Sequence, residues 1–143
     1  MLIEKEFVSF GHQFSFRSAC AKKKAIEKRK FSPILIQFLD CVYQVMNQFQ
    51  TLFEFNSKLL VDIAFHYFSL RFGTFIGNSE KQRKELKVKE QTISLWTFIN
   101  YNKEKYLNPF YKPERTEFYP ETTLIKMKLW EELYVKWPTI AQQ

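Results

Sequence analysis

The clearest helical pattern in the chain lies at residues 32–55, SPILIQFLDCVYQVMNQFQTLFEF. Its apolar side chains recur at intervals of three and four residues, which places them along one side of an α-helix. Ser32 followed by Pro33 is typical of an N-cap and a first helical turn, because proline has no N–H to leave unpaired. We therefore predict a long amphipathic helix that starts at Pro33, with an apolar side made of Ile34, Leu35, Phe38, Cys41, Val42, Val45 and Phe49.

The opposite side of this helix is polar but mostly uncharged. It carries Gln37, Asp40, Gln44 and Asn47. A helix side that faces solvent usually carries more charge, with acidic and basic residues interspersed. This side is therefore predicted to be covered by other protein.

Composition favours a mainly α fold. The chain has 143 residues and 17.4 kDa, which is long enough to bury a core. Sixteen phenylalanines argue against disorder of the whole chain, and three glycines leave little material for the tight turns of a β-sandwich. No repeat, low-complexity tract or linker is visible, so we predict one domain over residues 1–143.

Several shorter helices are expected around the long one. Ile3, Phe7, Phe10 and Phe14 follow helical spacing, with Gly11 near the end of that helix. Asn56 is a suitable N-cap for a second helix, which we expect Gly73 to end in a left-handed cap. The apolar stripe predicted for that second helix consists of Leu59, Leu60, Ile63, Tyr67 and Leu70.

The last third of the sequence alternates charged and apolar segments. Residues 79–91 are predicted as a solvent-facing helix or loop, with Ser79 and Gln82 at capping-box spacing. Residues 92–100 are dense in apolar groups and predict a short buried helix. A final helix is expected before Pro138, with one side made of Leu124, Met127, Trp130, Leu133, Tyr134 and Trp137.

Charge suggests an anionic partner without specifying it. The net charge is +7, and residues 22–30 read KKKAIEKRK. This run is open to three interpretations: a contact with an anionic membrane, a solvated loop, or a nuclear-import or RNA-binding patch. The residues predicted to contact anionic lipid in the first interpretation are Lys22, Lys23, Lys24, Lys28, Arg29 and Lys30.

Cysteine and histidine usage argues against disulfides and metal. Cys20 and Cys41 form no disulfide framework, which predicts a reducing, cytoplasmic setting. His12 and His66 are the only histidines, too few for a zinc site without a close cysteine pair. His12 lies among aromatic residues and is predicted to have a packing role. No signal peptide or spanning helix is apparent, so the chain is expected to be soluble.

Blocks spread over nearly the whole chain resemble the second half of the phosphatase domain of the myotubularin family, in the same order. LIEKEF is similar to the family's LIEKEW, and SFGHQF is similar to its SFGHKF segment. The blocks are 2–7 (LIEKEF), 9–14 (SFGHQF) with Arg17, 37–42 (QFLDCV), 48–49 (QF), 53–56 (FEFN), 72–80 (FGTFIGNSE) with Gln82 and Arg83, 94–96 (SLW) and 108–111 (NPFY).

This resemblance implies the helical C-terminal half of an α/β cysteine-phosphatase domain. In the family, a Cys-x5-Arg loop supplies the nucleophile and the phosphate-binding arginine, and it lies upstream of the segment that resembles residues 2–7. Ile26 follows Cys20 at the arginine position, and Asn47 follows Cys41. No catalytic, cofactor-binding or metal-binding residue is therefore predicted here. Gln50 stands where the family commonly has proline, so the long helix is expected to extend toward Phe53.

Two main functions are compatible with this sequence. The first is the structural portion of a phosphatase that removes the 3-phosphate of phosphatidylinositol 3-phosphate or 3,5-bisphosphate, inactive alone without the Cys-x5-Arg loop. The second is a short non-catalytic protein that acts as an adaptor for an active myotubularin. A basic module that binds anionic lipid or nucleic acid through residues 22–30 is a third, weaker candidate, and nucleic acid is the less expected of these two partners. The partners implied are the rest of a myotubularin-like domain or another myotubularin, in the cytoplasm and peripherally at endosomal membranes.

Overall fold

The computed structural model describes residues 2–18, 32–113 and 117–135. Within these ranges the backbone is largely helical and forms no strand beyond an isolated antiparallel bridge between Phe55 and Leu107. The prediction of a mainly α fold is confirmed. None of the helices in the described ranges combines the length and hydropathy that a bilayer-spanning segment needs.

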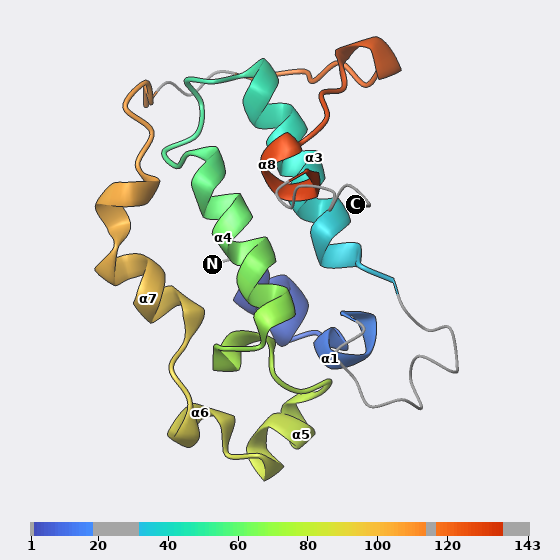
Figure 1. Cartoon of the computed structure of the whole chain (residues 1–143), viewed down its shortest axis with the longest axis vertical. Helices are drawn as coiled ribbons and strands as arrows, with labels where there is room; N and C mark the ends of the chain where they lie inside the picture. Colours follow the sequence, from blue (N-terminus) through green and yellow to red (C-terminus); the bar gives the residue numbers. More distant parts are fainter. Residues whose placement is uncertain (1, 19–31, 114–116, 136–143) are drawn as a thin grey trace, which may run out of the picture.

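Two helices form the centre of the molecule. Helix α3 (Ile34–Gln48) and helix α4 (Ser57–Ser69) pack side by side, and the shorter elements surround them (Figure 1). Each fully buried aliphatic or aromatic side chain contributes about 1.5–3 kcal/mol of transfer free energy. The buried core includes Phe14, Leu35, Leu39, Leu60, Ile63, Ala64, Tyr67, Phe75, Leu95 and Trp130.

The bounds of α3 differ from the prediction at both ends. The helix starts at Ile34, one residue after the expected Pro33, and the Ser32 hydroxyl makes no cap because Pro33 occupies the N-cap position. The helix ends at Gln48, and a turn follows, so the expected extension toward Phe53 is wrong.

The apolar side of α3 was also predicted only in part. Leu35 is buried as expected, but Ile34 and Cys41 are exposed, and Ile36 and Leu39 are buried although they lay outside the predicted set. The reason is that α3 is covered from two directions, by α4 and by the C-terminal segment. A spacing pattern that assumes one buried side therefore assigns the wrong residues to the borders of the buried surface.

The polar side of α3 is covered in part, at Asp40 and Gln44, by residues 117–135, which we call the strap, whereas Gln37 is exposed. The Gln44 side chain donates to the Lys128 carbonyl oxygen (2.8 Å) and accepts from the Lys128 N–H (3.0 Å). Gln48 makes the same pair of bonds with Glu121, at 3.0 and 2.8 Å. Tyr134 donates its hydroxyl to Asp40 (2.9 Å). Uncharged amides suit this side because each can donate to a backbone carbonyl oxygen and accept from a backbone N–H of the extended strap.

The N-terminal segment is two short helices, not the single helix that was predicted. A π-helical turn, η1 (Ile3–Val8), is followed by a turn at Gly11 (φ +74°) and then by α1 (Phe14–Arg17). Phe10 is 78% exposed, so it leaves the expected stripe. Gly11 ends the first helix because it adopts the left-handed conformation that glycine tolerates best.

Helix α4 starts as predicted and ends earlier than predicted. Asn56 is the N-cap residue by backbone conformation, but its side-chain amide donates to the carbonyl oxygens of Lys105 and Leu107 (both 3.1 Å). Leu70, with φ +50°, supplies the left-handed C-cap that was expected at Gly73. Gly73 instead opens the 3-10 turn η2 (Gly73–Phe75).

The charged segment folds into two short helices, α5 (Glu80–Glu85) and α6 (Val88–Gln91). The predicted cap is confirmed, since Ser79 Oγ accepts from the Gln82 N–H (3.2 Å). The expected short helix is α7 (Leu95–Tyr101), capped by Ser94 and followed by η3 (Lys103–Tyr106). It is buried on one side, at Leu95 and Ile99, whereas Tyr101 and the preceding Ile93 are exposed, so the segment is not buried throughout as expected.

The strap replaces the long C-terminal helix that was predicted. It contains only a 3-10 turn, η4 (Leu124–Lys126), and α8 (Glu131–Tyr134), joined by extended residues. Leu124 is 84% exposed, whereas Trp130 is fully buried and stacks on Tyr43 with ring centroids 4.7 Å apart. The apolar spacing was misleading because Trp130, not a whole helical side, anchors this segment. Trp137 and Pro138 lie outside the described residues.

Candidate functional site

The residues predicted to contact anionic lipid lie outside the described ranges. The six basic residues between Lys22 and Lys30 all fall within 19–31, so their role stays a prediction. The candidate site described below is formed instead by η2, α5, α6 and the start of α7.

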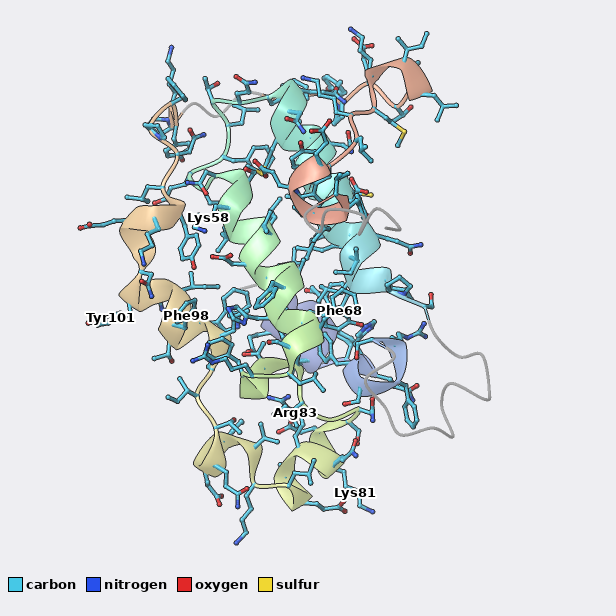
Figure 2. All side chains as sticks on the ribbon, in the orientation of Figure 1. Lys58, Phe68, Lys81, Arg83, Phe98 and Tyr101 are labelled. Atoms are coloured by element: carbon cyan, nitrogen blue, oxygen red, sulfur yellow. The ribbon has the colours of Figure 1, made fainter. Side chains whose placement is uncertain are left out.

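Arg83 is the centre of this site. Its Nη1 donates to three backbone carbonyl oxygens, those of Gly73 (2.9 Å), Thr74 (3.3 Å) and Ile76 (2.7 Å). Its side chain is 11% exposed, and its Nε lies 3.8 Å from Glu80 Oε2. Arginine suits this position because its planar guanidinium keeps its charge and presents several fixed donors. Figure 2 shows Arg83 just below the end of α4. Arg83 therefore holds the loop between α4 and α5.

Hydroxyl groups connect this loop to α7. Thr74 Oγ1 accepts from the Leu95 N–H (3.0 Å) and lies 3.2 Å from Ser94 Oγ. Nearby, the Trp96 indole N–H donates to Glu4 Oε1 (2.9 Å), which brings the N-terminal turn against α7. Three segments that are distant in the sequence, the N-terminal turn, the loop before α5 and the start of α7, therefore meet near Thr74.

Gly73 is a point of close backbone approach. A Cβ atom at this position would collide with the Thr92 hydroxyl and lie 2.9 Å from Val88 Cγ1. The φ angle of Gly73 is not positive, so the requirement is for space and not for an unusual conformation. The α6 helix can pack onto the loop only because this residue has no side chain.

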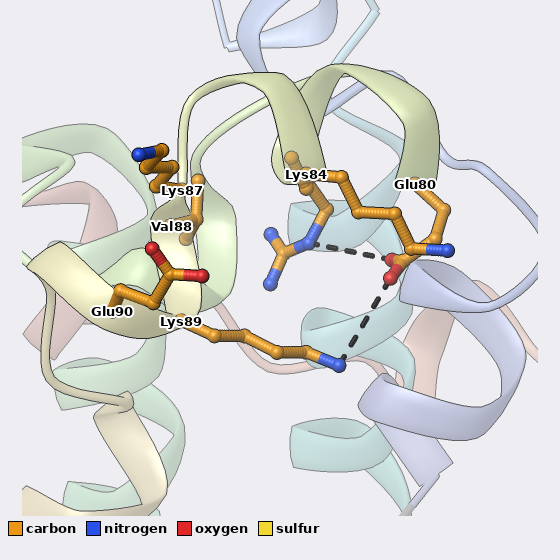
Figure 3. A pocket seen from close by; sticks show the side chains of 7 residues that line it. Glu80, Lys84, Lys87, Val88, Lys89 and Glu90 are labelled. Carbon is orange, nitrogen blue, oxygen red and sulfur yellow. Dashed lines mark ion pairs between the residues drawn. The ribbon is translucent and has the colours of Figure 1, made fainter.

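A small charged pocket of about 150 Å³ opens beside Arg83. It is lined by four basic and two acidic side chains and by Val88 (Figure 3). Lys89 reaches across it, with Nζ 3.9 Å from Glu80 Oε1. The lining residues are Glu80, Arg83, Lys84, Lys87, Val88, Lys89 and Glu90.

An open groove of about 500 Å³ adjoins this pocket and shares Arg83, Val88 and Lys89 with it. Four residues with hydroxyl groups line it, namely Thr74, Thr92, Ser94 and Thr97, together with the charged Glu4. The pocket and groove contain hydrogen-bond donors and charged side chains, which are groups that bind and position a polar ligand. Arg83 Nη1 is occupied by carbonyl oxygens, and Arg83 Nε lies opposite Glu80, so this guanidinium group is engaged in holding the loop.

The two histidines are packing residues. His12 lies edge-on to Phe7 and Phe14, with centroid distances of 5.1 and 4.8 Å, in agreement with its predicted role. Burial, and then the charge of Arg17, lowers the pKa of His12. Burial is also the main cause of the lowered pKa of His66, whose Nδ1 lies 3.3 Å from Ser69 Oγ.

Cys41 lies exposed on α3 and is not part of a phosphate-binding loop. Asn47, the residue at the arginine position of a Cys-x5-Arg motif, belongs to the same helix and donates to the Tyr43 carbonyl oxygen. Among the described residues, no three potential metal-binding side chains come together.

Sequence reasoning did not single out Arg83 or Thr74 as central residues. Arg83 appeared only within a family block, and Thr74 only within FGTFIGNSE. Each acts through partners up to 21 positions away, which no local spacing reveals.

Comparison with known proteins identifies the family to which this chain is similar. A family model for the myotubularin-like phosphatase domain matches residues 1–84. Myotubularin of Rattus norvegicus is 44% identical over 145 residues, which cover 100% of this chain and 24% of the relative. Phosphatidylinositol-3,5-bisphosphate 3-phosphatase MTMR6 of Mus musculus is 44% identical over 94% of the chain and 22% of its own length. The corresponding MTMR2 enzyme of Bos taurus is 41% identical, over 96% of the chain and 21% of its own length.

The chain belongs to the myotubularin-like phosphatase family. The resemblance inferred from the sequence blocks is thereby confirmed. The chain spans about a quarter of the length of these relatives.

Proposed function

We propose that this chain is the structural, helical portion of a myotubularin-like phosphatase domain that removes the 3-phosphate of phosphatidylinositol 3-phosphate or 3,5-bisphosphate. The observation that carries this proposal is that the whole chain matches about a quarter of myotubularin, at 44% identity. The relatives named MTMR6 and MTMR2 are phosphatidylinositol-3,5-bisphosphate 3-phosphatases.

The site around Arg83 favours a structural role for this chain over a catalytic one. Arg83 and Thr74 use their polar atoms to fix the loop between α4 and α5, and neither cysteine of the sequence is followed by arginine at the sixth position. By this proposal, the chain alone hydrolyses no phosphoinositide. Its helices would instead support a catalytic loop supplied by another part of the domain.

An adaptor that binds an active myotubularin is the second candidate. The observation that favours it is the row of exposed apolar side chains in the strap, including Leu124, Ile125, Met127 and Leu129. Exposed apolar side chains of this kind often mark protein-interaction surfaces. In either role, a cytoplasmic location at endosomal membranes is part of the proposal.

The endogenous polypeptide distinguishes these candidates. An antibody against residues 112–123 would be used to measure its mass and then to capture it for a phosphate-release assay on both lipids. A polypeptide well above 17.4 kDa that releases phosphate supports the phosphatase proposal. A 17.4 kDa polypeptide that co-purifies with an active myotubularin, and that releases no phosphate once this partner has been removed, supports the adaptor and contradicts the first proposal.

A further inference from the structure

Helices α5 and α6 form a helical hairpin, residues 80–91, at one end of the molecule (Figure 1). Leu86 ends α5, and Lys87 adopts a left-handed conformation (φ +48°) that separates the two helices. We propose that this hairpin is a contact surface for anionic lipid membranes. The proposal concerns a site different from residues 22–30, and it does not depend on whether the chain belongs to an active phosphatase.

The backbone of the hairpin is fixed before any partner arrives. Ser79 caps α5, and the Gln82 side chain accepts from the Asn78 N–H (2.8 Å). Arg83 ties α5 to the preceding loop, and the buried Val88 packs α6 against Gly73. Binding would therefore order only side chains, so little conformational entropy is lost.

The outer surface of the hairpin is basic. The segment has five basic and three acidic residues, but Arg83 is almost buried, so four lysines and three glutamates form its outer charges. Lys81 and Lys89 form exposed ion pairs, at 4.0 Å with Glu85 and 3.9 Å with Glu80. Among the described residues, Lys84 and Lys87 have no ion-pair partner although both are exposed. These two ammonium groups are the ones available to lipid phosphates.

Leu86 adds an apolar group between these two lysines. It is 48% exposed at the junction of α5 and α6. The adjacent Glu85 is paired with Lys81. A leucine with Lys84 and Lys87 nearby suits the membrane interface, because the apolar group enters the acyl boundary while the ammonium groups stay among the headgroups. A nucleic acid would satisfy the lysines but offers no apolar layer for Leu86, so the observations favour lipid.

Flotation of the full 143-residue chain with vesicles tests this contact. The wild-type chain is expected to float with vesicles that contain phosphatidylserine and not with pure phosphatidylcholine. Lys84→Gln/Lys87→Gln should weaken binding about tenfold, because each lysine near the surface contributes to attraction. Leu86→Ser should weaken binding severalfold and leave its salt dependence unchanged.

The matched control is Lys103→Gln/Lys112→Gln, which removes the same charge from exposed positions elsewhere. This control should bind as the wild-type chain does. The loss of binding caused by Lys84→Gln/Lys87→Gln should also persist in a chain whose six basic residues within 22–30 have been changed to glutamine. Equal losses in the control, or wild-type binding by both hairpin variants, would overturn the proposal. The proposal would also be overturned if the chain bound no vesicles but bound single-stranded RNA tightly, with an affinity that Leu86→Ser leaves unchanged. That result would indicate nucleic acid as the partner.

Discussion

Arg83 shows how one side chain organises the region between α4 and α7. A lysine at this position would present a compact ammonium group, whereas the guanidinium fits three carbonyl oxygens at once. The bonds are short and largely shielded from water, so they are worth more than surface contacts. The neighbouring Lys84 has no comparable role and remains exposed.

Replacing Arg83 should therefore destabilise the chain far more than replacing its neighbour. Arg83→Met leaves three carbonyl oxygens without this donor and should lower the free energy of unfolding by about 3 kcal/mol. Lys84→Met, at an exposed position, should change it by no more than about 0.5 kcal/mol. Urea unfolding followed by circular dichroism measures both. Equal effects of the two substitutions would show that Arg83 does not hold the loop.

At the residue scale, the sequence predicts local features well and distant ones poorly. The Ser79–Gln82 cap was predicted because both partners lie within four residues. Gly73 was correctly predicted to be a position that needs glycine, but the predicted reason, a left-handed cap, was wrong. The true reason is the close approach of Thr92 and Val88, which lie in and after a later helix. The role of Arg83 in holding the loop was not predicted, since an arginine among lysines is expected to face solvent unless its carbonyl partners are known.

Among the elements, η3 is attached to α4 by a buried tyrosine. The Tyr106 hydroxyl donates to Asp62 Oδ2 (2.9 Å), and Lys58 lies 3.7 Å from the same oxygen. Burial, followed by the hydrogen bond and the charge of Asp62, raises the pKa of Tyr106 from 10.0 to about 12. The native state therefore keeps the Tyr106 proton where the unfolded chain has lost it.

This tyrosine gives the chain a pH-dependent stability with a defined sign. The contribution is complete below pH 10 and is lost as the pH rises from 10 to about 12, because the folded state binds more protons in that interval. Tyr106→Phe should cost about 1.5 kcal/mol at neutral pH. The difference between the wild-type chain and this variant should shrink above pH 10, as measured by urea unfolding. A constant difference across that interval would contradict the assigned hydrogen bond.

The strap is held to α3 by a few separate anchors, of which Trp130 is the largest. Trp130→Ala removes the ring that stacks on Tyr43, a loss of about 3 kcal/mol or more. The backbone N–H groups of Glu121 and Lys128, which donate to Gln48 and Gln44, should then exchange with solvent at least tenfold faster. Hydrogen exchange measures this effect.

The control for this prediction is Tyr119→Ala, within the same strap. Tyr119 is exposed, and within the part of the chain that the structure describes its hydroxyl bonds to the nearby Glu117 alone, so its loss should leave exchange at Glu121 and Lys128 unchanged. Equal protection in the Trp130→Ala variant would mean that the glutamine bonds hold the strap without the tryptophan.

At the element scale, periodicity predicted the central helices and failed at both ends of the chain. Helices α3 and α4 have enough turns and enough buried side chains for the 3.6-residue pattern to dominate, whereas α7 was expected from the density of its apolar residues. The N-terminal pattern was interrupted by Gly11, and the strap pattern was a coincidence of spacing around one buried tryptophan. Short or extended segments that are held by other elements carry no reliable period.

For the whole molecule, the amount of exposed apolar surface predicts self-association of the isolated chain. Sedimentation velocity should show species larger than a monomer, because such surface favours association. Leu124→Lys/Ile125→Lys should shift the distribution toward monomer, since both side chains are exposed. A monodisperse, cooperatively melting wild-type monomer would contradict this prediction. Other large apolar side chains that are exposed include Phe10, Phe65, Phe68, Phe110, Met127 and Leu129.

At this scale, the sequence was most informative through its ordered motifs. The family followed from separated blocks between residues 2 and 111, and the comparisons confirmed it. The treatment of the chain as one partial domain remains a prediction. Which surface meets the rest of a phosphatase did not follow from the sequence, because the exposure of Leu124 and Ile125 depends on how the strap lies on α3.

A chimera tests most directly whether this chain supports a phosphatase active site. The segment of rat myotubularin that aligns with this chain would be replaced by residues 1–143, and phosphate release from phosphatidylinositol 3-phosphate would be measured. If the chain is the structural portion of the domain, the chimera should fold and keep phosphatase activity within about tenfold of the parent, and Arg83→Met should reduce both its stability and its activity. A chimera that melts cooperatively but releases no phosphate would contradict the proposed function.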